Sequence, residues 1–479
     1  MRTGAWAARC ARIALAACLG LSTLARADGL PPLPSDPVLT SLIEQSLASR
    51  PELAEARATV QAERERVPQA SAFADPMLTV GWQNDGFTSI EIGKMEGSYV
   101  SIMASEAFPW PGKRALRGEI VELGARQGEQ GIARLRLATE ADVRRAWLDL
   151  LLARDRLGLL EKLDEIWARA GDVAKVRYET GEGSQNDVLR SRLERDRLAQ
   201  RRLALQAQDR VLVRQLNRQR GHPLDEAIDT GSHLSDLAAP AIPDAAAALD
   251  DARSRSPELA AARLGVSQSE KAQELSGKGY FGDLTVGAGI MLRGGDFPPM
   301  WQVSLGAPLP IFAGSKQGRA VAETEARTVA RRRGVEAVEQ ALALRIEERR
   351  VVLASLLDAA RLYREQLLVR SEATSQAALA QYAVGKAAFA SVLEANAGLV
   401  ADQDAFLQTL VDAQRIAIAF HEVSLDPVST AVSGAMGGAA MPGAGAMAGG
   451  GSKGAGAGSS AAAPADAAQG GGGAMPSGM

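Results

Sequence analysis

The sequence has few residues of the kinds that carry chemistry. Its two cysteines, Cys10 and Cys18, both lie within the first 27 residues, so the rest of the chain has no disulfide framework and no thiolate metal site. The three histidines, His222, His233 and His421, show no i, i+4 spacing, which argues against a zinc site. The phosphate-loop pattern G-x-x-x-x-G-K-[ST] is missing as well. We therefore predict neither enzymatic activity nor a bound cofactor or metal ion.

Aromatic residues and long apolar runs are also scarce, and the net charge is small. Aromatic residues make up 4% of the chain and the net charge is −3. The first value is low for a β-rich protein, and the second gives no reason to expect a nucleic-acid partner. Beyond residue 27, no apolar run approaches the ~20 residues that a membrane-spanning helix needs. The middle of the chain is instead rich in strong helix formers such as Ala, Leu, Arg, Glu and Gln.

The N-terminus has the organisation of a secretory signal. A positive segment with three arginines up to Arg12 is followed by an apolar segment that ends at Leu24, and Ala25-Arg26-Ala27 offers a small-x-small cleavage site. We predict a signal peptide over residues 1–27. The alternative is a lipoprotein box that would place a lipid on Cys18. It is disfavoured because only five apolar residues separate Arg12 from Cys18.

The sequence contains an internal duplication. Four motifs recur in the same order at an offset of close to 200 residues, which indicates a duplicated domain and not a short solenoid repeat. The four pairs are Arg50–Arg57 with Ser256–Arg263, Asp75–Gly81 with Gly282–Gly287, Pro109–Pro111 with Pro308–Pro310, and Tyr178–Leu189 with Tyr382–Leu393. We predict a first repeat over residues 28–230 and a second over 231–428.

The last segment, residues 429–479, is rich in Gly, Ala and Ser, and we predict a disordered tail. It holds five of the eleven methionines: Met436, Met441, Met447, Met475 and Met479. Thioethers suit Cu(I) or Ag(I). Their spacing here is irregular, however, and favours a plain low-complexity linker.

Long helices are expected in both repeats. No proline occurs between Pro111 and Pro223 or between Pro310 and Pro427, and each stretch is rich in helix formers. If residues 115–177 form one helix, its length is ~95 Å. The predicted fold is mainly α with a small β part, each copy running helix, strand, strand, very long helix, turn, helix. An Arg-rich outer face indicates a solvated surface, with a coiled-coil stalk as the alternative.

Four short segments alternate apolar residues with small or polar ones. They lie at about 77–84 and 98–107 in the first repeat and at 283–292 and 301–308 in the second. Such segments are typical of a transmembrane β-barrel. We expect these side chains to face lipid: Leu78, Val80, Trp82, Leu284, Val286, Ile290, Trp301, Val303 and Leu305. The alternative is two hairpins packed on a soluble core.

Four strands cannot close a barrel, because the smallest membrane barrels use ~8 strands. An open sheet edge in lipid would leave backbone groups unpaired at a prohibitive cost. If the strands span a membrane, the chain must therefore oligomerise. Three copies would supply twelve strands, although this argument alone does not fix the number at three.

Several motifs resemble the TolC-type outer membrane efflux protein family. They are Arg50-Pro-Glu-Leu with Ala56-Arg57, Ala74-Asp75-Pro76, Phe108-Pro-Trp-Pro-Gly-Lys-Arg114, and the two Tyr-x-x-Gly turns with Val-Leu downstream. The segment from Phe108 to Arg114 looks most like the heavy-metal and cation branch, the CzcC and CusC relatives. The resemblance covers roughly residues 36–428.

The resemblance implies a homotrimer in the outer membrane of a Gram-negative bacterium. Its strands would form a 12-stranded barrel in lipid, and its helices would continue this barrel as an α-barrel in the periplasm. The channel would work with a periplasmic adaptor protein and an inner-membrane pump, commonly of the resistance-nodulation-division class. It would be a passive duct, and the cargo, whether metal cations, small toxic compounds or polypeptides, stays open.

The resemblance also implies gate and tip residues in the two turns: Tyr178, Gly181, Asp187, Tyr382, Gly385, Lys386 and Glu394. The family closes this tip with a Tyr–Asp–Arg network and acidic rings. Ala387 stands where the arginine is expected, so the salt bridge is either carried by Lys386 or absent. Of two acidic-ring positions, one is Ser391 and the other is Glu394. For Asp187 and Glu394, ordinary surface carboxylates are the alternative.

Two other functions remain open from the sequence. A periplasmic adaptor or coiled-coil binding protein also has long helical hairpins, but adaptors carry one hairpin and a much larger β-rich part. A duct for type I protein secretion would have the same design as an efflux duct.

Overall fold

The structure is a computed structural model that describes residues 30–34 and 36–427. The predicted signal peptide, Cys18 and the predicted tail lie outside the described residues. The chain divides into two units, Met1–Val432 and Ser433–Met479, and the second lies wholly outside the described part. Everything below concerns the first unit.

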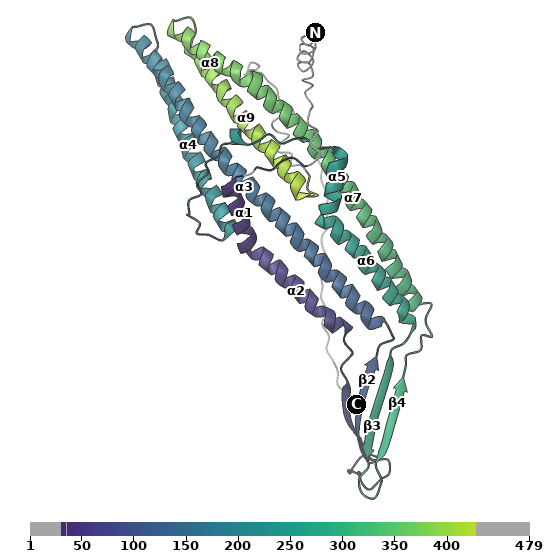
Figure 1. Cartoon of the computed structure of the whole chain (residues 1–479). Helices are drawn as coiled ribbons and strands as arrows, with labels where there is room; N and C mark the ends of the chain where they lie inside the picture. Colours follow the sequence, from purple (N-terminus) through teal and green to yellow (C-terminus); the bar gives the residue numbers. More distant parts are fainter. Residues whose placement is uncertain (1–29, 35, 428–479) are drawn as a thin grey trace, which may run out of the picture. The chain divides into compact units, whose positions relative to one another are not determined.

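The described residues are mainly helical with one small sheet, as predicted (Figure 1). The first repeat contains α1 (Pro37–Ser49), α2 (Pro51–Ser71), β1 (Met77–Gln83), β2 (Tyr99–Phe108), α3 (Lys113–Glu179) and α4 (Gln185–Arg220). The second contains α5 (Ala245–Arg255), α6 (Pro257–Gly277), β3 (Leu284–Leu292), β4 (Met300–Gly306), α7 (Gln317–Leu362), α8 (Leu368–Ala383) and α9 (Phe389–Glu422). Short 3-10 helices lie at Leu234–Asp236 (η1) and Lys278–Tyr280 (η2). The order of elements is the same in both copies, with α7 and α8 together in the place of α3.

Each repeat begins with two helices where the sequence led us to expect one. Arg50 ends α1 and precedes α2 with an extended backbone, φ −65° and ψ 118°. Ser256 does the same between α5 and α6, with φ −66° and ψ 113°. The cause is the next residue, Pro51 or Pro257, because proline disfavours the helical conformation of the residue before it yet fits the first helical position.

The long helix is continuous in the first repeat and interrupted in the second. Helix α3 has 67 residues, a length of about 100 Å at 1.5 Å per residue. Its counterpart contains a π-helical turn, Tyr363–Leu367 (η3), between α7 and α8. The ring of Tyr363 packs at 6.3 Å from that of Phe406 on α9. Neither proline nor glycine marks this point, so the interruption is not evident in the sequence.

Three clusters of buried side chains hold the helices together. One joins α1, α3 and α4 to α9 around Trp147, which is fully buried. The second joins α5, α7 and α9 around Phe420. The third joins α3 and α4 to α8 and α9 and includes Trp167 and Tyr382. Helix α9 contributes to all three, and two of the clusters contain side chains from both repeats.

The strands form one antiparallel sheet in the order β1-β2-β3-β4. Its central pair, β2 and β3, comes from different repeats. The observed strands differ from the predicted ranges by one or two residues at their ends. Strands β1 and β4 each have one edge without a partner strand in the described chain.

The register assigns every strand residue to one of two faces, since paired residues share a face. The apolar face carries Leu78, Val80, Trp82, Val100, Ile102, Ala104, Glu106, Phe108, Leu284, Val286, Ala288, Ile290, Leu292, Trp301, Val303 and Leu305. The mixed face carries Met77, Thr79, Gly81, Gln83, Tyr99, Ser101, Met103, Ser105, Ala107, Thr285, Gly287, Gly289, Met291, Met300, Gln302, Ser304 and Gly306. Apart from Glu106, near the end of β2 on the apolar face, the sheet thus separates apolar side chains from small, polar and thioether ones.

Candidate functional site

Two regions of the molecule carry the predicted functional residues: the turns between the paired long helices, and the sheet. Helix α3 connects them, because it begins four residues after β2 and ends at the first turn (Figure 1). In this turn Gly181 has φ 77°, and in the second turn Gly385 has φ 73°. Both values lie in the left-handed region, where glycine has no steric penalty but most other residues have one.

Tyr382 and Asp187 meet across the two turns. Tyr382 is the second-last residue of α8 and is only 2% exposed. Its hydroxyl donates a hydrogen bond to Oδ2 of Asp187, in the first turn of α4, at 3.0 Å. Its ring packs edge-on against Phe389, with the ring centroids 5.1 Å apart. The structure therefore brings together two of the predicted gate residues.

Burial and the neighbouring Asp187 keep the tyrosine protonated. Burial, followed by the hydrogen bond to Asp187, raises the pKa of Tyr382 to about 12. The phenol consequently remains a hydrogen-bond donor to this carboxylate throughout the physiological pH range. The contact is thus a stable link between α4 and α8.

An arginine joins this pair, but it is not at the position implied by the resemblance. Arg177, in the last turn of α3, donates from Nη1 to the carbonyl of Tyr382 and from Nη2 to the carbonyl of Glu182 at 3.1 Å. Its guanidinium lies 4.8 Å from the centre of the Tyr382 ring, within range of a cation–π contact. Sequence reasoning missed Arg177, although it directly precedes Tyr178 of the first Tyr-x-x-Gly turn.

The remaining predicted turn residues are on the surface of the single chain. Tyr178 is 48% exposed, and Lys386, Ser391 and Glu394 are exposed as well. Within the described residues Lys386 forms no ion pair, so this part of the chain does not give it the role of the missing arginine. Glu394 lies in the groove between α4 and α9, a hollow of about 880 Å³ that Arg197 and Arg201 also line.

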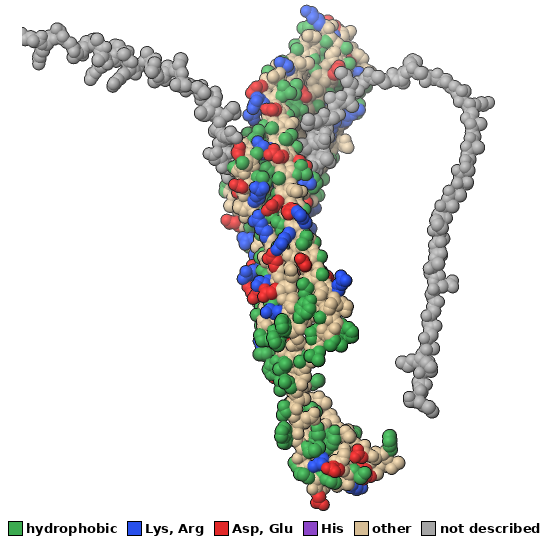
Figure 2. All heavy atoms as spheres, turned by 90° about the vertical axis from the view of Figure 1, so that its right-hand side faces the viewer, with side chains coloured by type: hydrophobic (Ala, Val, Ile, Leu, Met, Phe, Trp, Pro, Cys, Tyr) green, Lys and Arg blue, Asp and Glu red, His purple; other side chains and the backbone are tan. Residues whose placement is uncertain are grey.

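The apolar face of the sheet is uncovered in the single chain. Trp82 is 81% exposed, Trp301 79% and Leu305 70%. The other residues predicted to face lipid are also exposed and lie on this same face: Leu78, Val80, Leu284, Val286, Ile290 and Val303. On the side shown in Figure 2, hydrophobic side chains gather over the strands and the adjoining helix ends, whereas charged side chains cover the helices. A surface of this kind needs an apolar environment or a partner.

The junction between sheet and helices contains a buried lysine with two partners and several aromatic rings. Lys113, at the start of α3, donates from Nζ to Asp283 and to the carbonyl of Phe281, both at 2.6 Å. The Trp110 ring stacks on that of Phe281 at 4.8 Å. Arg114 lies 3.4 Å from the ring centre of Phe73. Aromatic rings next to an exposed apolar band are typical of the two interfaces of a bilayer.

Among the helices that the structure describes, none is both long and apolar enough to cross a bilayer. Within the same residues no group of three or more His, Cys, Asp or Glu side chains is arranged to hold a metal ion.

A protein-family model matches the second repeat. Residues 248–421 match the family model of the outer membrane efflux proteins. The match covers most of the second repeat and less than half of the chain. A search of curated proteins found no match.

Solved structures extend the likeness to both repeats, at the level of the fold. The outer-membrane channel OprN has 18% sequence identity and a TM-score of 0.65, covering 81% of this chain and 90% of its own. CusC, whose study concerns transmembrane channel formation, has 15% sequence identity and a TM-score of 0.62, covering 81% of this chain and 92% of its own. The outer membrane protein VceC from Vibrio cholerae has 17% sequence identity and a TM-score of 0.63, covering 80% of this chain and 95% of its own. The chain therefore has the fold of these outer-membrane proteins, while the heavy-metal branch is not singled out.

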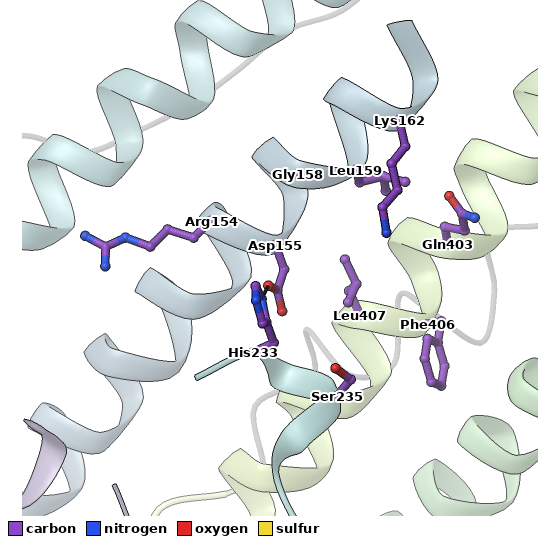
Figure 3. A pocket seen from close by; sticks show the side chains of 10 residues that line it. All are labelled: Arg154, Asp155, Gly158, Leu159, Lys162, His233, Ser235, Gln403, Phe406 and Leu407. Atoms are coloured by element: carbon purple, nitrogen blue, oxygen red, sulfur yellow. Dashed lines mark hydrogen bonds and ion pairs between the residues drawn. The ribbon is translucent and has the colours of Figure 1, made fainter. Parts of the chain in front are cut away.

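A separate cleft lies beside the link between the repeats (Figure 3). It has a volume of about 420 Å³ and lies between α3, α9 and η1. His233 and Asp155 point toward one another at its side, with Nδ1 2.6 Å from Oδ1. The second oxygen of Asp155 accepts a hydrogen bond from the backbone N–H of Leu234 at 2.9 Å. Asp155 thus connects the segment between the two repeats to the middle of α3.

The interaction between His233 and Asp155 should depend on pH. The hydrogen bond to Asp155 and its charge raise the pKa of His233. The ion pair is then fully present below the ordinary histidine pKa of about 6.5 and is lost as the pH rises through the raised folded-state pKa. We expect His233→Ala to lower the thermal midpoint in detergent at about pH 5.5 and to have less effect at about pH 8.5. Because the ring is exposed, the shift should be small.

The matched control is Asp155→Asn, which keeps the side chain's shape and removes its charge. In this background His233→Ala should show no difference between the two pH values. A shift of equal size at both pH values in the native background would contradict the assignment.

Proposed function

We propose that this protein is the outer-membrane channel of an efflux system and assembles with two sister copies into a passive duct. In this proposal the apolar face of the sheet meets lipid and the mixed face lines the bore. The helices continue the duct into the periplasm, and the turns at Gly181 and Gly385 form its closed end.

The sheet carries the proposal. Within the described residues it has one exposed apolar face, four strands and two unpaired edges. Backbone groups at an edge cannot remain unpaired in lipid, so the edges of β1 and β4 must find partners. The strands alternate in direction, and β4 of one copy can therefore pair antiparallel with β1 of the next. Repetition of this contact closes a ring, and three copies would supply twelve strands.

The turns suggest how the duct would be closed. Tyr382, Asp187 and Arg177 link the α3–α4 hairpin to the α8–α9 hairpin within one chain. In a ring of three chains these links would hold the two hairpins of each chain together, as three pairs, at the end of the duct. Glu394, if it faces the bore there, would add a ring of three carboxylates that attracts cations.

The proposed partners follow from the passive role, since the sequence contains no phosphate-loop pattern for nucleotide hydrolysis. A passive duct needs a pump, and we propose an inner-membrane pump, of the resistance-nodulation-division class, joined through a periplasmic adaptor. The exposed turns, with Tyr178, Lys386 and Val384 at the surface, would contact the adaptor. The proposed cargo is metal cations or small toxic compounds, in line with the resemblance of residues 108–114 to the heavy-metal branch.

Two alternatives are tested by the same material. A periplasmic adaptor would be monomeric or bound to the inner membrane and would form no pore. A type I secretion duct would form the same pore but serve a polypeptide exporter.

The experiment is extraction of the full-length protein from separated membranes. We expect it in the outer-membrane fraction as an SDS-resistant trimer that, in planar bilayers, conducts ions in discrete steps. A soluble periplasmic monomer without channel activity would contradict the proposal.

A further inference from the structure

The methionines of this chain are distributed very unevenly. Between Met1 and Met436 there are five, and all lie in strands or in the loop between β1 and β2: Met77, Met95, Met103, Met291 and Met300. None of the described helices contains methionine, although the residue is a good helix former. Helix formation and core packing therefore do not account for where methionine occurs.

The strand register places three of the thioethers together. Met291 on β3 is the direct cross-strand partner of Met300 on β4. Met103 on β2 is the direct partner of Gly289, which precedes Met291 by two residues and shares its face. All three methionines lie on the mixed face. Diagonal neighbours of this kind are within reach of long side chains.

Gly289 makes room for this arrangement. A Cβ atom at Gly289 would lie 2.5 Å from Cγ of Met103, so the Met103 side chain lies over β3 at the place where Gly289 leaves space. Met291 and Met300 are adjacent to that place. Three thioethers therefore surround one glycine, and the flexible methionine side chains can turn their sulfur atoms toward a common point.

Apolar packing does not explain the cluster. Its neighbours on the mixed face are small or polar and include Ser101, Gly287, Gln302 and Ser304, whereas the bulky apolar residues lie on the opposite face. Met300 is 39% exposed. Met103 and Met291 are half-buried, so a ligand can reach the cluster from the side of Met300.

We propose that Met103, Met291 and Met300 bind a soft monovalent cation, Cu(I) or Ag(I). Thioether sulfur prefers these ions over Mg²⁺, Ca²⁺ or Mn²⁺, which take oxygen ligands. This inference rests on the proposed function in one respect: in the channel the mixed face lines the bore, and the site would then contact the cargo on its way out. The cargo class it indicates is soft metal cations.

The test uses the full-length channel in detergent, with Ag(I) and, under reducing anaerobic conditions, Cu(I) as separate probes against a competing chelator. The variant Met103→Leu/Met291→Leu/Met300→Leu keeps side-chain volume and removes the three sulfurs. We expect it to lose one bound ion per chain and to weaken binding at least tenfold. Binding of either ion equal to that of the native protein would overturn the proposal for that ion.

Two controls separate the cluster from the other methionines. Met77→Leu/Met95→Leu removes two sulfurs from the same region and should leave the site intact. Replacing the five tail methionines with leucine should likewise preserve one site per chain. Loss of all high-affinity binding in the tail variant would overturn the proposal, because the native binding would then belong to the tail.

A further variant tests the geometry with every sulfur present. Gly289→Ala places a Cβ 2.5 Å from Cγ of Met103 and 2.7 Å from the carbonyl oxygen of Ile102. Both the Met103 side chain and strand β2 must then shift, and binding should weaken several-fold. Unchanged affinity in an assembled Gly289→Ala channel would contradict convergence on this point. If that variant does not assemble, X-ray absorption of Ag(I) on the native channel decides, since sulfur must be its nearest neighbour and must disappear in the triple leucine variant.

The two proposals can fail separately. A trimer that conducts ions but binds neither cation refutes only the methionine site. A chain that binds Ag(I) through these residues but never conducts refutes only the channel.

Discussion

Replacing Val80 with arginine is expected to keep the protein out of the outer membrane. Val80 lies on the apolar face of β1 and is 63% exposed in the single chain. A charged residue on the lipid face of a membrane barrel costs about 2–4 kcal/mol near the bilayer midplane, and three copies would carry the charge together. The measurement is the fraction of protein recovered as SDS-resistant oligomer from the outer membrane, which should fall severely.

The control is the adjacent residue. Thr79→Arg places the same charge in the same strand but on the mixed face, which would line the bore. This variant should assemble and alter the ion selectivity of the channel instead of its insertion. Equal loss of assembly in both variants would show that the two faces are not in different environments, and the assignment of the apolar face to lipid would be wrong.

Replacing Asp187 and Tyr382 together with alanine should open the duct. The double change removes the hydrogen bond between α4 and α8 and a buried ring that packs on Phe389. Truncation of a buried aromatic side chain typically costs about 3–5 kcal/mol, so the closed arrangement of the turns should lose much of its stability. The expected result is a several-fold rise in single-channel conductance in planar bilayers.

Smaller changes divide this effect. Tyr382→Phe removes only the hydroxyl and should raise conductance less, because a hydrogen bond to a charged group contributes about 1.5–3 kcal/mol. Arg177→Ala should also raise conductance, since Arg177 contacts the carbonyl and the ring of Tyr382. Lys386→Ala serves as the control and should have little effect. If the double variant conducts at the native level, the turns do not control the opening of the channel.

The parts of the fold that were predictable are those set by local pattern. Alternation in the strands fixed which residues share a face, because side chains on a strand point alternately to its two sides. The proline-free stretches indicated long helices, and α3 is one uninterrupted helix of 67 residues. Gly181 and Gly385 were recognisable as turn residues. Each of these features depends on neighbours a few residues apart.

The features that were missed depend on contacts between distant residues or on a local rule that was not applied. Arg177 is 205 residues from Tyr382, and no local pattern relates the two. The π-helical turn at Tyr363–Leu367 coincides with the contact of Tyr363 with Phe406 on another helix. The break before Pro51, in contrast, was predictable from the effect of proline on the residue before it. The methionine cluster needed the register between strands of different repeats.

The pairing of β1 with β4 of a sister copy is the central claim, and engineered cysteines test it most directly. The described residues contain no cysteine, so one cysteine placed on β1 and one on β4 would be the only reactive thiols there. Oxidation in the outer membrane should give covalent dimers and a closed trimer on a denaturing gel, with nothing larger, for at least one pair of facing positions. If every pair along the two edges yields only monomer, or a ladder that continues beyond three, the proposed closed channel is contradicted.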